Sequence, residues 1–314
     1  MNEFWYNLRS RYGSQDFKKH GLSFSVRRKQ NQSKRFIMRR HIFTDARGRA
    51  MELAVPPERV ISLVPSLTET LFELGLGERI VGVSRYCKYP ADQIDSRTRV
   101  GGVHDPDRGK ILSLEPDLII ANMEENRKED IEFFEGKGLR VYMTFSKTVE
   151  DVISLIEELG ELAEVIPRAQ EISRDMRKEY DRIRKSEKES RPLRVFYPVW
   201  RNPYFSINRD TYIHHVLAVC GGENIFADEE KRYFPVTLET VAERRPEVIL
   251  LPSEPYVFGE KHKTDFSSHI DMPAVRDGKV LLVDGEMVCW YGGRTREGLP
   301  YLRRLFEELS VNLP

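Results

Sequence analysis

Aromatic side chains gather in stretches of this sequence that show neither helical nor strand periodicity. They are Trp200, Tyr233, Tyr256, Phe258, Trp290 and Tyr291. Flat rings on loops are suited to stacking against a planar macrocycle or to covering the apolar rim of a chelate. Such rings also cap the cores beneath their loops, so we expect roughly half of them to line a ligand cleft.

Two acidic residues, Glu124 and Glu125, follow a run that is typical of a buried strand, Pro116–Asn122. Carboxylates there can hold a metal or a ligand amide, or pair across a cleft with Arg201 or Arg294. Paired carboxylates can also serve as an acid and a base. Because no nucleophile with its base accompanies them, we expect cross-cleft ion pairing first, ligand contact next and catalysis last. The sequence thus predicts a binding protein and not an enzyme.

Residues that commonly bind metals are sparse. His214 and His215 are adjacent in a helical pattern, so their side chains point about 100° apart. His104 follows a glycine pair and could reach a cleft. Cys87 and Cys289 each border an aromatic residue, where a small buried side chain is more common than a thiolate ligand. The three cysteines form no C-x-x-C pair, and neither a Walker A nor a G-x-G-x-x-G motif is present.

Strand and helix patterns alternate in both halves of the chain. A buried strand at 59–64 is followed by a helix at 67–74, for which Ser66 and Glu69 predict a capping box. The second half repeats this plan from a strand at 193–200, and this alternation is typical of parallel sheets covered on both sides. The sequence therefore predicts an α/β fold with two similar lobes and a ligand cleft between them.

The segment between the two repeats reads as helix only. An apolar stripe runs through 149–162, and a second continues to about residue 188, which predicts a strut about 30 Å long. We therefore expect a first lobe at 38–147 that opens with a hairpin at 40–54, a helical linker at 148–188 and a second lobe at 189–314.

Composition narrows the classes of partner. Lys+Arg and Asp+Glu balance at 50 each, which does not favour nucleic acid. Residues 1–37 read as a basic, disordered arm. No apolar run approaches the ~20 residues of a membrane span, and the start lacks an export signal. We therefore expect a monomer that is cytoplasmic as the sequence is written.

Several segments, in order, resemble the helical-backbone (class III) substrate-binding proteins of ABC importers, of the iron/cobalamin periplasmic-binding type. The segments are Arg59–Glu69, Val100–Gly102, Pro116–Ala121 and Cys220–Phe226. Asn122–Asn126 and Trp290–Arg294 are similar to a branch described as cobalamin-binding-like or metal-receptor-like. The resemblance implies a cleft for cobalamin, heme, an iron–siderophore or another metal chelate, with no intrinsic cofactor. It also implies a place outside the cytoplasm, where members of the family usually act.

Carried over to this chain, the cleft loops follow the strand ends of each lobe. The implied ligand-binding residues are Pro65, Ser66, Tyr86, Cys87, Gly102, Glu124, Glu125, Asn126, Trp200, Arg201, Tyr233, Glu254, Tyr256, Trp290 and Tyr291. The family docks on its importer through an acidic residue on each lobe. Glu239 fits this role in the second lobe, whereas the first lobe has Gly109 at the matching place, with Asp105 or Asp107 as substitutes.

Three hypotheses therefore stand beside one another. The first is the ligand-binding component of an ABC-type uptake system for metal chelates or corrinoids. The second is a cytoplasmic carrier or sensor on the same fold. The third is an enzyme that uses Glu124 or Glu125 as its base.

Overall fold

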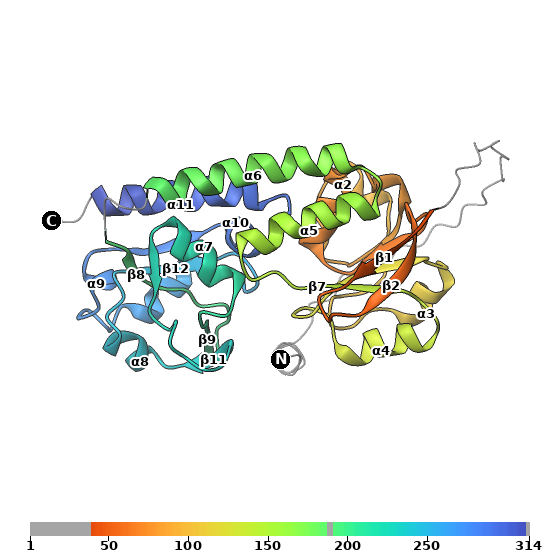
Figure 1. Cartoon of the computed structure of the whole chain (residues 1–314). Coiled ribbons are helices and arrows are strands. Elements are labelled where there is room, and N and C mark those ends of the chain that lie inside the picture. The colour runs from red at the N-terminus through yellow and green to blue at the C-terminus, as the bar shows by residue number, and fades with distance from the viewer. Residues whose placement is uncertain (1–38, 187–190, 312–314) are drawn as a thin grey trace.

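The computed structural model describes residues 39–186 and 191–311; the predicted basic arm at 1–37 lies outside them. Two α/β lobes lie side by side, and helices run across the top of both (Figure 1). This confirms the predicted two-lobed α/β architecture.

The first lobe is built on a parallel sheet with the order β5-β4-β3-β6-β7. Its strands are β3 (Val60–Ser62), β4 (Ile80–Val83), β5 (Thr98–Arg99), β6 (Leu118–Asn122) and β7 (Val141–Thr144). Its helices are α2 (Pro65–Glu73), α3 (Arg108–Ser113) and α4 (Lys128–Gly136). Strand β6 is buried throughout, because helices cover both faces of the sheet.

Alternate residues of β6 enter two different cores, as the twofold periodicity of a strand requires. Leu118 and Ile120 pack with α2 and α5 on one face. Ile119 and Ala121 pack with residues of α3 and α4 on the other face. Helices on both sides therefore hold the carboxyl end of β6, where Glu124 and Glu125 follow, in a fixed position.

The second lobe repeats this plan with a parallel sheet of order β10-β8-β12-β13. Its strands are β8 (Leu193–Phe196), β10 (Gly222–Asn224), β12 (Val248–Pro252) and β13 (Val280–Val283). A separate antiparallel pair joins β9 (Tyr204–Ile207) to β11 (Tyr233–Val236). The helices are α7 (Tyr212–Cys220), α8 (Leu238–Glu243), α9 (Pro273–Arg276), α10 (Gly285–Cys289) and α11 (Thr295–Val311), with a 3₁₀ helix η4 (Glu260–Phe266).

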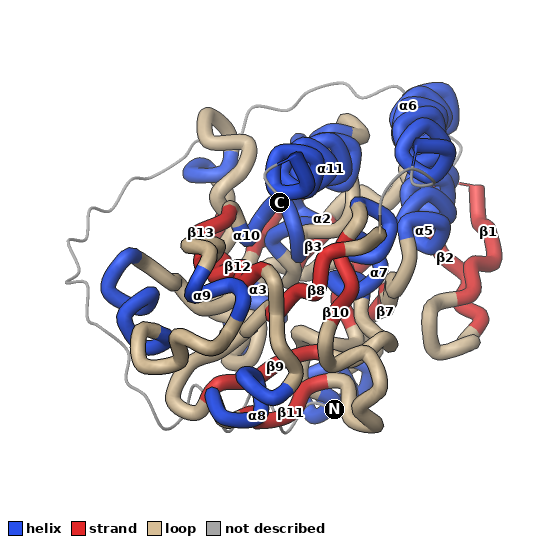
Figure 2. Tube along the Cα trace, turned by 90° about the vertical axis from the view of Figure 1, so that its left-hand side faces the viewer, coloured by secondary structure: helices blue, strands red, loops and turns tan. Residues whose placement is uncertain are grey.

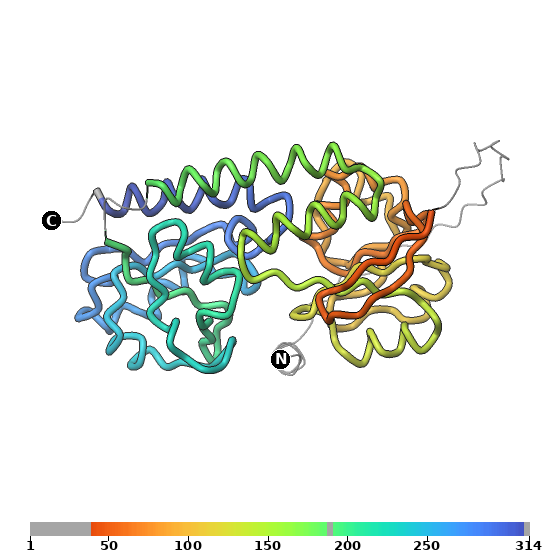
Figure 3. Tube along the Cα trace, viewed as in Figure 1, coloured from red at the N-terminus to blue at the C-terminus, as the bar shows by residue number. Residues whose placement is uncertain are grey.

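The predicted long helix between the lobes is α6 (Ile166–Ser186), which has 21 residues. It runs beside α5 (Val149–Leu162) and α11, and Figure 2 shows the three helices nearly end-on. The tube view shows α6 crossing from one lobe to the other (Figure 3). One apolar core, which includes Leu71 of α2, Met176 of α6 and Leu217 of α7, continues through both lobes on this side. Since both lobes share that core, the junction is broader than a single helix.

The start of the first lobe forms the predicted hairpin. Strands β1 (Arg39–Thr44) and β2 (Ala50–Val55) pair antiparallel, and the turn closes with the Gly48 amide donating to the Asp45 carbonyl at 2.8 Å. The Ala46 amide donates to the Met143 carbonyl at 2.9 Å, which attaches the turn to β7.

The predicted capping box at the start of α2 is wrong. The helix begins at Pro65, its N-cap residue is Val64, and no side chain caps it. Proline is favoured at this first position because its missing N–H would lack a partner there in any case. Glu69 is consequently available for another role, and its carboxylate pairs with Arg294 of the second lobe.

Candidate functional site

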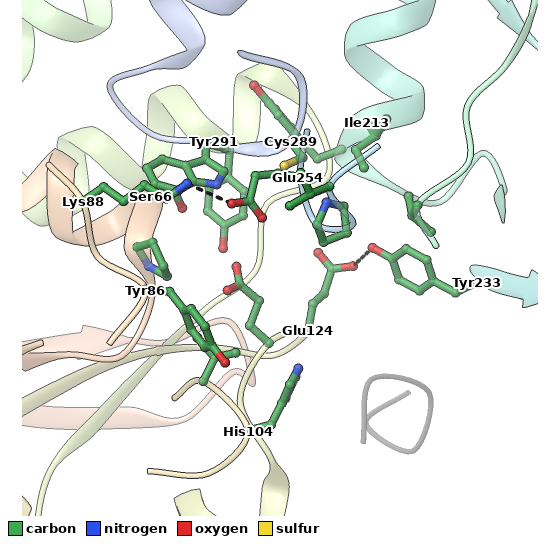
Figure 4. Close-up of a pocket in the computed structure, with 18 residues that line it drawn as sticks. Ser66, Tyr86, Lys88, His104, Glu124, Ile213, Tyr233, Glu254, Cys289 and Tyr291 are labelled. Atoms are coloured by element: carbon green, nitrogen blue, oxygen red, sulfur yellow. Dashed lines mark hydrogen bonds and ion pairs between the residues drawn. The ribbon is translucent and has the colours of Figure 1, made fainter. Parts of the chain in front are cut away.

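The carboxyl ends of the parallel strands from both lobes face one cavity of about 320 Å³, where open α/β sheets usually bind their ligands. Figure 4 shows its wall, with side chains converging from both lobes. Nine of the residues implied by the sequence line it: Pro65, Ser66, Tyr86, Glu124, Glu125, Tyr233, Glu254, Trp290 and Tyr291. His104, which the sequence left undecided, also lines it.

The other six implied residues do not line this cavity, and each has a structural role nearby. Asn126 is buried, and its side chain accepts from the Asn122 amide at 2.8 Å and donates to the Val103 carbonyl at 3.0 Å. The Cys87 thiol is buried 3.2 Å from the Thr68 hydroxyl. Gly102 lies so close to the Asp105 carboxylate that a Cβ atom would not fit.

The remaining three residues, Trp200, Arg201 and Tyr256, lie in loops of the second lobe. The rings of Trp200 and Tyr256 meet edge-to-face, with centroids 5.3 Å apart. Arg201 forms an ion pair with Asp265 at 2.6 Å. These side chains therefore stabilise the loops beside the cavity and do not form its wall.

Several wall residues were not among the implied ligand-binding residues. They are Lys88, Val103, Val199, Tyr212, Ile213, Pro255, Val257 and Cys289. Most adjoin a predicted loop residue, so extending each predicted loop by one or two positions would have found them. Tyr212 and Ile213 are different, because they lie on the first turn of α7, which the sequence marks only as helix.

Glu124 forms an ion pair across the cleft, as expected, but with a different partner. Its Oε1 atom lies 2.7 Å from Arg232 Nη2 and accepts a hydrogen bond from the Tyr233 hydroxyl at 2.8 Å. The proposed partners are engaged elsewhere, since Arg201 pairs with Asp265 and Arg294 with Glu69. Burial raises the pKa of the Glu124 carboxyl, and the charge of Arg232 offsets part of this effect.

Lys88 crosses the cleft in the opposite direction. This first-lobe ammonium lies 3.1 Å from Glu254 Oε1 and 2.7 Å from Glu286 Oε1, both in the second lobe. Burial alone would lower the pKa of Lys88, but the hydrogen bonds to Glu286 and Glu254 raise it above its usual value. Its Nζ atom also lies 5.9 Å from the centre of the Trp290 ring. Lys88 is therefore a fixed cation on the cavity wall.

The two aromatic residues of the Trp290–Arg294 segment face the cavity with restricted freedom. Trp290 meets the Tyr89 ring edge-to-face at 6.0 Å, and the Arg294 guanidinium lies 5.3 Å from the Trp290 ring. The Tyr291 hydroxyl accepts a hydrogen bond from the Asn122 side chain of the first lobe. These contacts hold both rings in position before any ligand enters.

The next residues form a close interlobe contact, which we call the seam: Gly292, Gly293, Arg294 and Arg296 against α2. The Gly293 amide donates to the Thr70 hydroxyl at 3.0 Å. Gly292 has a φ of +116°, and a Cβ atom on it would overlap the Thr70 side chain. Glycine is required there for both its conformation and its size.

Ion pairs complete the seam. Arg294 Nε and Nη2 donate to the two carboxylate oxygens of Glu69 at 2.8 and 2.5 Å. Arg296 Nη2 lies 2.8 Å from Glu73 Oε1. Arg294 Nη1 is also 3.8 Å from Glu286, the carboxylate that holds Lys88. The seam and the cavity wall therefore share Glu286 as a neighbour.

Over the described residues, no group of three His, Cys, Asp or Glu side chains is placed to hold a metal ion. No helix in the same part of the chain has the length and apolar character needed to cross a membrane.

Known structures share this architecture. The crystal structure of the periplasmic vitamin B12 binding protein of Vibrio cholerae matches with a TM-score of 0.72 and 27% identity, covering 81% of this chain and 98% of that one. A periplasmic heme-binding protein from Roseiflexus matches with a TM-score of 0.71 and 23% identity, covering 81% and 99% of the two chains. At that identity the second match shows the fold alone.

Sequence comparison agrees with the structural one. The vitamin B12-binding protein of Vibrio cholerae is 33% identical over 194 residues, which cover 62% of this chain and 70% of that protein. The vitamin B12-binding protein of Pectobacterium carotovorum is 27% identical over 245 residues, or 74% and 87% of the two chains. The family described as "Periplasmic binding protein" matches residues 60–286. The chain therefore belongs to the periplasmic binding protein family.

Proposed function

We propose that this protein binds a metal chelate of the cobalamin, heme or iron–siderophore class in the cavity between its lobes. The observation that carries the proposal is the cavity itself, at the carboxyl ends of both parallel sheets and walled by Tyr86, Trp290 and Tyr291. Relatives named vitamin B12-binding proteins and neighbours titled as B12- and heme-binding support this class of ligand.

The wall suits a flat, partly apolar ligand. Its exposed surface is mostly apolar and carries a few fixed polar groups, the usual composition of a small-molecule site. The cavity of about 320 Å³ is at the lower end of the range for such sites, roughly 300 to 1,000 Å³. We therefore propose that a macrocycle inserts one edge between the aromatic rings and leaves the opposite rim in solvent.

The same proposal places the protein in an uptake system. It would deliver its ligand to the membrane subunits of an ABC importer, outside the cytoplasmic membrane, as a monomer that binds and releases without catalysis. Glu239 is exposed in the first turn of α8, and hydrogen bonds from its own amide and the Thr237 hydroxyl lower the pKa of its carboxyl. It is therefore an ionised docking candidate on the second lobe.

The first lobe offers a weaker docking candidate. Gly109 lies on α3, and the carboxylate of Asp107 caps that helix by accepting from the Lys110 amide at 2.9 Å. Asp105 is paired with Arg85 at 2.6 Å. We propose that docking relies chiefly on the second lobe, and that a Glu239→Lys change weakens co-purification with the importer without changing ligand affinity.

A thermal-shift screen tests the binding proposal. The chain is heated with cyanocobalamin, dicyanocobinamide, hemin and ferric siderophores in turn. A ligand at 100 times its dissociation constant stabilises the folded state by about 2.7 kcal/mol. We expect at least one chelate to raise the midpoint, and Trp290→Ala to abolish the shift.

Phe133→Ala is a suitable control, because it also removes an aromatic ring, but from α4 and outside the cavity. No shift with any chelate, or an equal loss in both variants, would contradict the proposed function.

A further inference from the structure

Arg294 contacts a residue of the cavity wall but does not line the cavity itself. It lines a separate pocket together with Glu69 and Tyr89. The carbon of its guanidinium lies 4.5 Å from the centre of the Tyr89 ring and 5.3 Å from the centre of the Trp290 ring. The face of an aromatic ring attracts a cation, more strongly where water is excluded, and 10% of the Arg294 side chain is exposed. The guanidinium is therefore held against two rings, and one of them, Trp290, belongs to the wall.

The first lobe fixes the position of this guanidinium. Arg294 Nε and Nη2 donate to the two carboxylate oxygens of Glu69 at 2.8 and 2.5 Å. Pairing through two parallel hydrogen bonds sets the plane of a guanidinium as well as its distance, which a lysine ammonium cannot reproduce. Glu69 lies on α2, and Tyr89 follows in the same lobe. A change in the separation of the lobes therefore displaces Arg294 from both of these partners.

The Trp290 ring has first-lobe neighbours as well. The Tyr89 ring meets it edge-to-face at 6.0 Å, and Lys88 Nζ lies 5.9 Å from its centre. Trp290 itself belongs to the second lobe, directly after α10. The turn at Gly292–Thr295, closed by an amide-to-carbonyl hydrogen bond of 3.1 Å, brings Arg294 back to this ring. The orientation of the ring thus depends on the approach of the two lobes.

On these observations, and resting on the proposed function, we propose that Arg294 is a positioning residue for ligand binding. It orients the Trp290 ring on the cavity wall, and it does so while Glu69 of the first lobe holds its guanidinium. Separation of the lobes releases the ring, so an ordered aromatic wall and a close approach of the lobes occur together. Ligand affinity is thereby coupled to the seam, although Arg294 lies outside the cavity.

The fluorescence of Trp290 tests this positioning without any ligand. Replacing Trp5 and Trp200 with phenylalanine leaves Trp290 as the single tryptophan of the full chain. Time-resolved anisotropy then measures the nanosecond motion of its indole ring. We expect Arg294→Met to raise the amplitude of this fast motion about twofold or more, because the ring loses the cation that holds it.

Arg296→Met is the matched control for this measurement. It also removes an arginine of the seam and an ion pair with α2, that between Arg296 and Glu73 at 2.8 Å. The contacts of Trp290 with Arg294, Tyr89 and Lys88 remain in this variant. We therefore expect the anisotropy of Trp290 to be unchanged.

Ligand affinity tests whether the orientation of the ring matters for binding. Cyanocobalamin and hemin are each titrated into the full chain by calorimetry. We expect Arg294→Met to weaken binding of whichever chelate binds by about ten times, which is about 1.4 kcal/mol, and Arg296→Met to leave it unchanged. Adding Glu69→Gln to Arg294→Met removes the uncompensated charge, so it should restore stability in part but leave the affinity low.

The outcomes separate this proposal from the function on which it rests. Equal anisotropy of Trp290 in the parent chain and in Arg294→Met would overturn the positioning role and leave a chelate-binding protein. Recovery of affinity on adding Glu69→Gln would overturn it as well, because a purely structural role would then explain the loss. Absence of binding by both chelates would contradict the proposed function, and the anisotropy, which needs no ligand, would still confirm or overturn the control of the ring by Arg294.

Discussion

The two lobes are in close contact at the seam but leave a space between them at the cavity. At the seam, Gly292 and Gly293 bring the backbone against α2, and bidentate pairing of Arg294 with Glu69 fills the contact. At the cavity, longer side chains such as Lys88 and Glu124 reach across and leave space between the lobes. The seam therefore fixes how far the lobes can approach, and that fixed approach keeps the cavity open for a ligand.

The largest expected effect is at Gly292. A Gly292→Ala change combines an unfavourable positive φ with overlap of its Cβ and the Thr70 side chain. We expect it to lower the free energy of unfolding by about 3 kcal/mol in urea denaturation. Gly138→Ala is the control, because Gly138 also has a positive φ, +81°, but open space around it. It should lose only about 1 kcal/mol, and equal losses in both variants would show that the close approach at the seam is unimportant.

A smaller loss is expected when the ion pair of the seam is broken. Arg294→Met leaves the partly buried carboxylate of Glu69, whose pKa is raised by burial, without its guanidinium partner. We expect the free energy of unfolding to fall by about 2 kcal/mol. Adding Glu69→Gln to this variant should recover part of the loss, because no uncompensated charge then remains. A double variant less stable than Arg294→Met would contradict this explanation.

The equivalent change at the cavity should affect stability less. Lys88 is half-exposed, and its buried partner Glu286 keeps Arg294 Nη1 at 3.8 Å, so Lys88→Met should lower the free energy of unfolding by about 1 kcal/mol, less than Arg294→Met. It should instead change ligand preference, because the wall becomes more negative. We expect affinity for a cationic corrinoid such as aquocobinamide to rise relative to hemin, measured by competition. A loss of stability as large as that of Arg294→Met would remove the distinction between seam and cavity.

The smallest effect concerns two cysteines: Cys87, which is buried, and Cys289, which lines the cavity. Burial raises the pKa of the Cys87 thiol to about 11, so roughly one thiol in a thousand is ionised at pH 8. Burial raises the pKa of Cys289 as well, but this residue lines the cavity. We expect iodoacetamide to modify native Cys289 slowly, faster as the pH rises, and Cys87 only after unfolding, as followed by peptide mass spectrometry. A bound chelate should slow the reaction of Cys289, and rapid native modification of Cys87 would contradict its burial.

Most of the fold was predictable from local pattern. The alternation of buried strands and amphipathic helices predicts both sheets and the α6 stripe, because these signals depend on neighbouring residues alone. The capping box at Ser66 failed because the helix begins at Pro65, two residues earlier than predicted, and Glu69 is recruited by Arg294 from a distant part of the chain.

The site was only partly predictable, for a related reason. A loop position shows that an aromatic residue is outside the regular elements, but not which way its ring points. Tyr233 and Trp290 face the cavity, whereas Trp200 and Tyr256 pack against each other. The partner of Glu124 was equally hidden, since the choice among Arg201, Arg232 and Arg294 depends on the arrangement of both lobes.

Amide hydrogen exchange with and without the chelate that gives the largest thermal shift would test the central claim most directly. We expect protection in the segments around 86–88, 124–125, 254–257 and 289–291, which contribute to the cavity wall in both lobes. We expect little change in α3 and α8, whose residues do not line the cavity. Protection confined to one lobe, or centred on segments outside the cavity, would contradict a ligand site between the lobes.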